Sequence, residues 1–393
     1  MSHDLDHDDD LDLTLDTDVR PVVRHRVRFT RQVFDPGNPV LREVMSKGED
    51  GDESKALVVI DNGLLEAQDH LPSAVTAYFQ TYRRVMPELR GLHVVPGGEA
   101  AKNDPGEVDR LLAQIHRGEI DRRSYVVAVG GGAVLDAAGF AAATAHRGVR
   151  LLRLPSTTLA QGDSGVGVKH GVNRFGQKNF LGGFAVPWAV VNDATLLGTL
   201  SDRDWRCGLA EAAKVALLKD AAFFAYLEGH TDALANRDAA VGDAVWRRSA
   251  ELHLRHIAAS AEEGGGGDPF ELDAARPLDL GHWSAHKLEA LSGFTLRHGE
   301  AVAIGLAIDT DYAARVGLTE PATAARVIAL LQRLGFDLRH PLRSDPRLLD
   351  GVEEFRAHLG GRLTLTLPGG VAESVVVHAV DLDAMRAAAA GGG

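Results

Sequence analysis

The chain has 393 residues, 45% hydrophobic and 25% charged, and this length favours two domains over a single core. Its formal net charge of -13 argues against a nucleic-acid binder, which needs a clustered basic surface. A single cysteine, Cys207, excludes an internal disulfide framework and predicts a reducing, cytoplasmic setting. No apolar run approaches the length needed to cross a bilayer, so no membrane partner is expected.

The chain opens on an acidic segment. The first twenty residues contain eight aspartates among scattered leucines. Low hydrophobicity combined with high net charge is typical of disorder. We therefore expect residues 1–20 to form a solvated tail outside the folded domains.

Short β-branched runs alternate with helix-like stretches from about residue 22 to residue 197. Continuous apolar runs separated by helices indicate parallel strands that are buried on both faces. The expected strands cover residues 56–60, 92–95, 125–129, 151–154 and 189–191, with helices over 107–117 and 133–145. This pattern predicts an α/β domain with parallel strands over residues 21–199.

The residue pattern changes after residue 201, where long segments rich in alanine and leucine carry charges at helical spacing. These segments cover residues 202–219, 240–261, 282–292 and 300–316. A short hairpin is expected from residues 362–367 and 374–378. Residues 200–393 are therefore predicted to form a second, mainly α-helical domain.

Three consecutive glycines, Gly130, Gly131 and Gly132, follow a buried strand and precede a helix. Such a turn lets the backbone approach a pyrophosphate, whose charge the helix N-terminus favours. A packing turn without a ligand is the alternative, because the spacing differs from GxGxxG. Asp61 ends another expected strand, where an acid can hold a ribose diol, and Glu99 and Lys102 follow a third.

A second group of polar residues lies in loops between two expected strands, over residues 156–179. Glycine, aspartate, lysine and asparagine are dense there, which is unusual for a simple connector and indicates function. Lys169 and Lys178, with Asn179, are suited to binding a phosphate and sugar hydroxyls. A solvated basic loop is the alternative interpretation.

A third group has the residue types of a metal site. Glu211 lies in a helical segment, His282 and His286 are four residues apart on one helix face, and His298 begins the next segment. One carboxylate and two imidazoles form a common catalytic zinc set. Spacing alone does not choose which two of the three histidines bind the metal.

Six motifs then occur in a fixed order. They are GGG-x3-D, PSTTLAQGDSGVG-x-KHGVN, KNFLG, GLAEAAK, GHWSAH and RHGEAVAIG, and they fall between about residues 61 and 305. This series resembles 3-dehydroquinate synthase and its sugar phosphate cyclase relatives. The resemblance implies a Rossmann-like N-terminal domain, a helical C-terminal domain, an active site between them, and a homodimer.

The resemblance also implies a role for each matching residue. NAD would be bound by Asp61, Glu99, Lys102, Gly130, Gly131, Gly132, Asp136, Ser156 and Thr157, and Zn2+ or Co2+ by Glu211, His282 and His298. The substrate pocket would contain Asp163, Lys169, Lys178, Asn179, Lys214 and His286, with Arg147 reaching the phosphate from the partner subunit.

As in the family it resembles, the enzyme would be a carbon–oxygen lyase that eliminates phosphate from a sugar phosphate. A transient oxidation by NAD acidifies a C–H bond, the metal stabilises the developing charge, and an intramolecular aldol step closes the ring. NAD is regenerated, so no net redox change occurs.

The sequence departs from dehydroquinate synthases where those enzymes hold the substrate carboxylate. Their motif R-x-L-L-N-F-G-H reads ARPLDLGH here, with Ala275 and Asp279 in place of Arg and Asn. A methyl group does not hold a carboxylate, and an ionised Asp279 repels one. Near the C-terminus, Arg356 and His358 stand in the segment where the family has a Lys-Lys pair, and we place both near the substrate.

These departures favour sedoheptulose 7-phosphate, which has a neutral hydroxymethyl group, and a valiolone-type product such as 2-epi-5-epi-valiolone or 2-epi-valiolone. The alternatives are a 3-dehydroquinate synthase, a 2-deoxy-scyllo-inosose synthase acting on glucose 6-phosphate, and a polyol dehydrogenase with the same fold. A binding protein without activity fits less well, because the metal and cofactor sets are complete.

Overall fold

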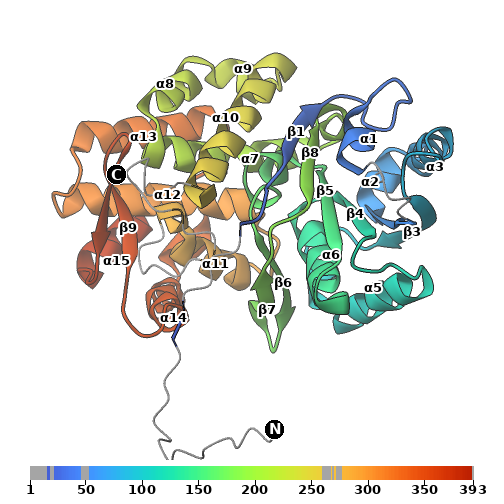
Figure 1. Cartoon of the computed structure of the whole chain (residues 1–393). Coiled ribbons are helices and arrows are strands. Elements are labelled where there is room, and N and C mark those ends of the chain that lie inside the picture. Colours follow the sequence, from blue (N-terminus) through green and yellow to red (C-terminus); the bar gives the residue numbers. More distant parts are fainter. Residues whose placement is uncertain are drawn as a thin grey trace, which may run out of the picture.

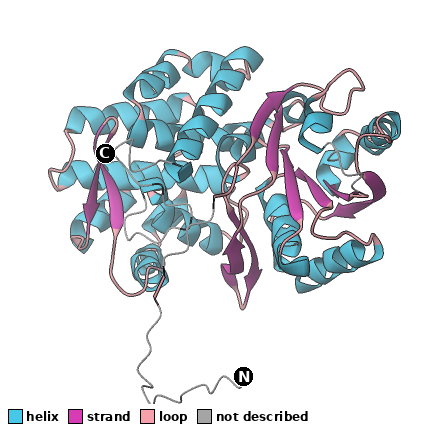
Figure 2. Ribbon diagram, viewed as in Figure 1, coloured by secondary structure: helices cyan, strands magenta, loops and turns pink. Residues whose placement is uncertain are grey.

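A computed structural model of the chain describes residues 16–17, 22–45, 53–258, 267, 270 and 277–391. The acidic tail expected over residues 1–20 therefore lies almost entirely outside the described residues. Figure 1 shows an α/β region beside a larger helical region, and Figure 2 shows that most of the strands lie in the first of these. Along the described part of the chain, no helix is both long and apolar enough to cross a membrane.

The α/β region is built on a six-stranded sheet in which every neighbouring pair is parallel, in the order β1-β8-β5-β4-β2-β3. The strands are β1 (Val27–Thr30), β2 (Lys55–Asp61), β3 (Glu88–Val95), β4 (Tyr125–Gly130), β5 (Arg150–Pro155) and β8 (Ala189–Asp193). Gly130 pairs with Pro155, so the ends of β4 and β5 meet at one edge of the sheet.

Side chains of β2 alternate between two buried faces, as expected for a sheet covered on both sides. Val58 and Ile60 pack with α1, α2 and α3, whereas Leu57 and Val59 pack with α5 and α6. The covering helices are α1 (Val40–Met45), α2 (Asn62–Ala67), α3 (Leu71–Thr81), α4 (Ala100–Asn103), α5 (Pro105–Arg117) and α6 (Gly132–Thr144).

The helical region has one large core to which α7 and α12 contribute the most residues, with α11 packed beside them. Its helices are α7 (Asp202–Lys219), α8 (Ala221–Gly229), α9 (Thr231–Ala235), α10 (Ala239–Ala258), α11 (His282–Leu291), α12 (His298–Arg315), α13 (Pro321–Arg333), α14 (Asp350–His358) and α15 (Leu382–Ala390). A hairpin of β9 (Leu365–Gly370) and β10 (Glu373–Val377) completes it.

These observations confirm the predicted fold class of a parallel α/β domain followed by a helical domain. The expected helix over residues 202–219 has the predicted bounds, and the expected C-terminal hairpin is present. A second hairpin, β6 (Lys169–Arg174) with β7 (Gln177–Phe184), was not predicted. It projects between the two regions in Figure 1.

Glycines allow α7, α11 and α12 to approach closely. A Cβ on Gly299 would lie 2.4 Å from the backbone of Cys207, which joins α12 to α7. A Cβ on Gly305 would lie 2.1 Å from the carbonyl oxygen of Gly281, at the start of α11. Both distances are far below a van der Waals contact, so only hydrogen fits at these two crossings.

We predict that Gly305→Ala destabilises the protein by about 1–3 kcal/mol, the usual range for overpacking a tight core. The added methyl group has to displace backbone atoms, which yield less readily than a flexible side chain. Urea unfolding followed by circular dichroism measures the change. Gly229→Ala is the matched control, since nothing lies within 4 Å of a Cβ there, and an equal loss in both variants would contradict the prediction.

Candidate metal and cofactor site

Glu211, His282 and His298 come together at the junction of α7, α11 and α12. One ligand atom of each residue lies within 4.8 Å of those of the other two. His298 Nε2 is 3.3 Å and His282 Nε2 is 3.6 Å from Glu211 Oε1. Glu211 is 2% exposed, and neither of its carboxylate oxygens has a hydrogen bond of normal geometry. A buried carboxylate facing two imidazole nitrogens fits a metal ion.

Hydrogen bonds fix which ring nitrogen each histidine presents. His282 Nδ1 is 3.1 Å from the carbonyl oxygen of Leu280, and His298 Nδ1 is 3.0 Å from Glu289 Oε2. Because a carbonyl or carboxylate oxygen only accepts, both Nδ1 atoms carry the hydrogen. The Nε2 atoms are left to face Glu211, as in metal sites with outer carboxylate or carbonyl partners.

Electrostatic interactions in this cluster are strong. Burial opposes ionisation of Glu211, but Lys214, whose Nζ is 2.5 Å from Oε2, and the two histidines hold the pKa of Glu211 well below its usual range. Burial likewise disfavours charge on His298, yet Glu289 and Glu211 raise its pKa to about 9. A metal ion would therefore displace a proton from His298 when it binds.

His286, Glu289 and His298 form a second group with the residue types of a metal site. In this group both carboxylate oxygens of Glu289 already have partners, Lys178 Nζ at 2.8 Å and His298 Nδ1. His286 is exposed and its ring stacks near that of His298, with centroids 6.0 Å apart. In the first group, Oε1 of Glu211 faces two Nε2 atoms and has no hydrogen bond, so this group is the better candidate.

The residues predicted to bind the cofactor meet at the ends of β2, β4 and β5. A Cβ on Gly130 would touch Asp61, one on Gly131 would lie 3.2 Å from Thr157, and the backbone N–H of Ser156 donates to the carbonyl oxygen of Gly130. A Cβ on Gly132 would lie 2.8 Å from the Ser164 hydroxyl, a buried group with no hydrogen-bond partner. This crowded, side-chain-free turn at the start of α6 fits a dinucleotide phosphate.

Residues that were predicted to bind the cofactor and residues that were predicted to bind the substrate form one polar network. Lys102 is 3% exposed, donates to Asp136 at 2.8 Å and also donates to Asn179. Lys178 on β7 pairs with Glu289 and lies 3.5 Å from Glu99 Oε1. The β6–β7 hairpin therefore links the cofactor edge of the sheet to the metal cluster.

Asp163 lies close to the metal cluster, as the sequence predicted for a substrate-pocket residue. Its Oδ1 atom is 2.7 Å from Nδ1 of His253 on α10. Burial and Glu211 oppose its ionisation, but His253 and Lys214 outweigh them and lower the pKa of Asp163. Asp279 precedes α11 in a 3-10 turn (Pro277–Asp279). Burial acts to lower the pKa of Lys214, but Glu211, Asp163 and, to a smaller extent, Asp279 raise it.

Two predicted substrate residues are not brought to this cluster. Arg147 is exposed and lies beyond the C-terminal end of α6, roughly 20 Å along the helix from the glycine turn. Within one chain it therefore lies at the opposite edge of the sheet, and a contribution from a partner subunit stays a prediction. Arg356 is half exposed and donates to Glu353 on its own helix.

The remaining predicted residues are placed only in part. Lys169 opens β6 with an exposed side chain, and its carbonyl oxygen accepts a hydrogen bond from the buried Arg153. The side chain of His358 lies outside the described structure, as do Ala275 and Arg276. The predicted replacement of a carboxylate-binding arginine therefore stays an inference from sequence.

Sequence reasoning missed two residues of the site. Glu289 lies three residues after His286 and seven after His282 on α11, a spacing that places all three on one helix face and could have revealed it. His253 carries no such signal, because it reaches Asp163 only through the packing of α10.

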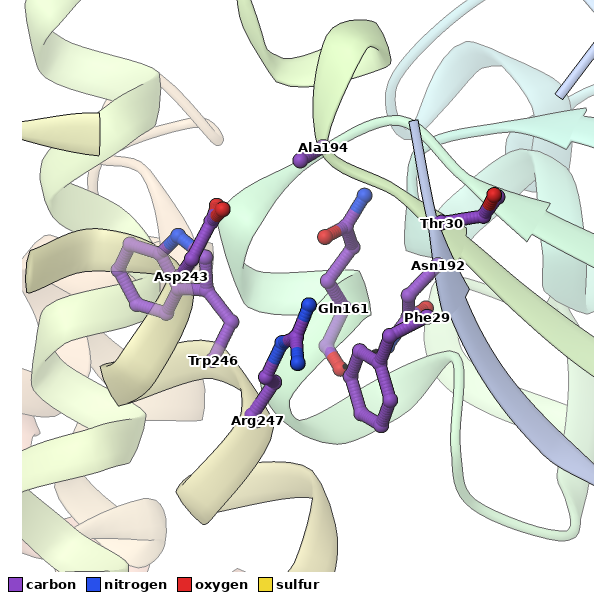
Figure 3. A pocket seen from close by; sticks show the side chains of 8 residues that line it. All are labelled: Phe29, Thr30, Gln161, Asn192, Ala194, Asp243, Trp246 and Arg247. Atoms are coloured by element: carbon purple, nitrogen blue, oxygen red, sulfur yellow. Dashed lines mark hydrogen bonds between the residues drawn. The ribbon is translucent and has the colours of Figure 1, made fainter. Parts of the chain in front are cut away.

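A separate crevice between the two regions, with a volume of about 10 Å³, contains none of the predicted side chains. Figure 3 shows Arg247 beside Phe29 across it, with the guanidinium carbon 5.3 Å from the ring centroid. Its lining residues are Phe29, Thr30, Gln161, Asn192, Ala194, Asp243, Trp246 and Arg247. The crevice has room for about one water molecule, so we assign it to packing between the regions.

Comparison with known proteins places this geometry in a family. Residues 92–207 match the N-terminal domain of 3-dehydroquinate synthase, and residues 208–352 match its C-terminal domain. The chain belongs to the 3-dehydroquinate synthase family of sugar phosphate cyclases, enzymes that eliminate phosphate and close a carbocycle.

Individual relatives differ in their reactions. The chain is 33% identical to 2-epi-5-epi-valiolone synthase from Streptomyces glaucescens, over 91% of this chain and 88% of the relative. It is 38% identical to 3-dehydroquinate synthase from Ruegeria pomeroyi, over 74% and 78%. The solved structure of 2-epi-5-epi-valiolone synthase from Streptomyces hygroscopicus, with NAD+ and Zn2+ bound, is 28% identical, covers 95% of this chain and 98% of that one, and superposes with a TM-score of 0.83.

We predict that His298→Ala abolishes tight metal binding and turnover together, because it removes one of three nitrogen or oxygen ligands. His286→Ala should keep stoichiometric metal and lose rate. Metal content after dialysis, measured by atomic emission, separates the two variants. Retention of one metal ion per chain and of activity in the His298 variant would refute the ligand assignment.

Proposed function

We propose that this enzyme binds NAD and Zn2+ or Co2+ and converts sedoheptulose 7-phosphate into a valiolone-type cyclitol. The observation that carries the choice of substrate is Asp279, an acidic side chain three residues before His282 and electrostatically coupled to Lys214. A substrate carboxylate at this position would meet a like charge, whereas a hydroxymethyl group can donate a hydrogen bond to it.

The cofactor and metal assignments rest on the fit of the residues. The glycine turn, Asp61 and the unpartnered Ser164 hydroxyl suit a dinucleotide, and Glu211 with two Nε2 atoms suits a divalent ion. The valiolone synthase of similar structure contains NAD+ and Zn2+. When bound, the two groups would supply a reversible hydride transfer and stabilisation of the negative charge that develops on substrate oxygen.

The side chains of the protein would bind and orient the substrate between these groups. Lys178 supplies a buried positive charge for phosphate or hydroxyl oxygens, and its pKa is raised because Glu289 and Glu99 outweigh burial. Lys214 balances Glu211 and stays protonated, so it would orient oxygens near the metal. Asp163 and its partner His253 form an acid–base pair of the kind that accepts and returns protons.

A 3-dehydroquinate synthase is the second candidate, because relatives with that activity reach 38% identity. Their shorter matches cover about three quarters of this chain, whereas the valiolone synthase match covers 91%. Asp279 favours the valiolone-type reaction, and activity assays discriminate the two.

We expect NAD to be required in catalytic amounts, with no net NADH at the end of the reaction. Lys102→Met should weaken NAD binding roughly ten- to a hundredfold, the loss expected for a buried charge-assisted contact, and should leave metal binding unchanged. Lys55→Met is the control, since Lys55 forms its ion pair with Glu119 at the other end of β2. Absorbance at 340 nm and calorimetric titration measure both effects, and NADH accumulating with product would indicate a dehydrogenase.

The substrate is tested by incubating the enzyme in parallel with sedoheptulose 7-phosphate, glucose 6-phosphate and the heptulosonate phosphate. We expect phosphate release and a cyclic product only with the first. Loss of a charge-assisted carboxylate contact costs about 1.5–3 kcal/mol, so the acid should react at least roughly tenfold less efficiently. Asp279→Asn should lower turnover of sedoheptulose 7-phosphate, because an amide oxygen is a weaker acceptor.

Phosphate release and product mass measure these outcomes, and Glu320→Gln on the surface of the helical region serves as the control. Efficient formation of dehydroquinate would overturn the substrate choice and leave the family assignment intact.

A further inference from the structure

Glu289 is a buried carboxylate on α11, 3% exposed, for which the reaction as described above has no direct role. It lies one helical turn beyond His286, and it touches neither Glu211 nor His282 in any interaction described here. It is nevertheless held between two basic side chains, His298 and Lys178. A buried charge of this kind is destabilising unless both of its oxygens are satisfied.

Both oxygens are satisfied, and by residues of different function. Oε2 accepts from His298 Nδ1 at 3.0 Å, and Oε1 accepts from Lys178 Nζ at 2.8 Å. His298 is a proposed metal ligand on α12, and Lys178 is a proposed substrate-binding residue on the β6–β7 hairpin. One side chain therefore fixes groups from two elements that do not neighbour each other in sequence.

We propose that Glu289 is a positioning residue that sets the tautomer and orientation of His298 for metal binding while holding Lys178 toward the substrate. The inference rests on the proposed function, in which His298 binds the metal and Lys178 contacts the sugar phosphate. The Nδ1–H···O contact leaves Nε2 of His298 directed at Glu211, 3.3 Å away. Outer carboxylates of this type typically change metal affinity or activity by roughly ten- to a hundredfold when they are removed.

The geometry argues against a direct metal contact by Glu289. A metal bound by His286, Glu289 and His298 would have to compete with the contacts that Glu289 already makes to Lys178 and His298. The carboxylate of Glu211 and Nε2 of His282 would then lie outside the metal site. A single metal ion at Glu211 satisfies more of the buried groups, so the wild-type protein should bind one ion per chain.

The test compares three variants of the full-length protein. Glu289→Gln keeps the shape of the side chain and removes its charge; Lys178→Met removes only the second partner. Glu354→Gln is the matched control, because Glu354 on α14 pairs with Lys287 of α11 and its own side chain is exposed. Each protein is stripped of metal, titrated with Co2+ and followed by visible absorption, and its metal-free unfolding midpoint is measured in urea.

We expect Glu289→Gln to weaken Co2+ binding roughly tenfold or more and to shift the cobalt absorption bands. Lys178→Met should raise KM for the sugar phosphate and change Co2+ affinity less than threefold, and Glu354→Gln should change neither. Glu289→Gln should change both the Co2+ affinity and KM for the sugar phosphate, because it weakens the contacts to both His298 and Lys178.

Unchanged Co2+ affinity and spectrum in Glu289→Gln would overturn this inference while leaving the proposed function in place. Binding of two Co2+ ions by the wild type, one of them lost in Glu289→Gln, would make Glu289 a ligand and overturn the inference equally. A wild-type protein that binds no metal at all would overturn the proposed function and, with it, the role of Glu289. If a lower urea unfolding midpoint of the metal-free protein accounts for the whole loss of Co2+ affinity in Glu289→Gln, the effect is structural and the inference also fails.

Discussion

The carboxylate of Glu211 is ionised in a buried position, and this charge sets the requirements for the elements packed around it. A buried charge is tolerated only with close opposite charges and hydrogen-bond donors, and here these are Lys214, His282 and His298. They come from α7, α11 and α12, so the three helices have to converge. That convergence requires backbone contacts that only glycine permits at Gly299 and Gly305. The packing of these three helices and the position of the charged cluster therefore both follow from the burial of the Glu211 charge.

The same reasoning extends outward along an alternating series of charges. Glu289 follows His298, Lys178 follows Glu289, and Glu99 lies beyond Lys178. Each member stabilises the ionised form of its neighbours, so removing one leaves the next partly buried and unpaired. Effects of substitutions along this series are expected to be non-additive, as in other charge networks. Because Lys178 is on the hairpin and Glu289 on α11, the series also fixes the position of the cofactor edge relative to the metal cluster.

Much of the fold could be predicted from local sequence because periodicity reports burial directly. The apolar runs that became β2 and β4, and the spacing that became α7, required no knowledge of their partners. The metal and cofactor residues could be selected only because their motifs resemble a family, since spacing left three histidines as equal candidates. The structure favours His282 and His298, because their Nε2 atoms face Glu211 Oε1, an arrangement that sequence does not record.

Other parts could not be predicted because they arise from tertiary packing. The β6–β7 hairpin contains glycines and polar residues at positions where a strand would ordinarily alternate, and β6 contacts α6 and the buried Arg153. The contact between His253 and Asp163 joins residues ninety positions apart, through the approach of α10 to a short π-helix (Ala160–Ser164). Neither segment carries a local pattern that specifies its partner.

The position of Asp279 bears on how substrate selectivity can change within this scaffold. Asp279 is three residues from the proposed metal ligand His282. Burial acts to lower the pKa of both His282 and Lys214, and the negative charge of Asp279 acts in the opposite direction on both. A neutral residue at 279 would therefore remove more than a repulsion toward acid substrates. It would also withdraw negative charge from Lys214, whose other partners are Glu211 and Asp163. Changing the substrate by this residue alone thus alters the electrostatic balance of the metal cluster, and a carboxylate-binding variant would need a compensating cation elsewhere in the pocket.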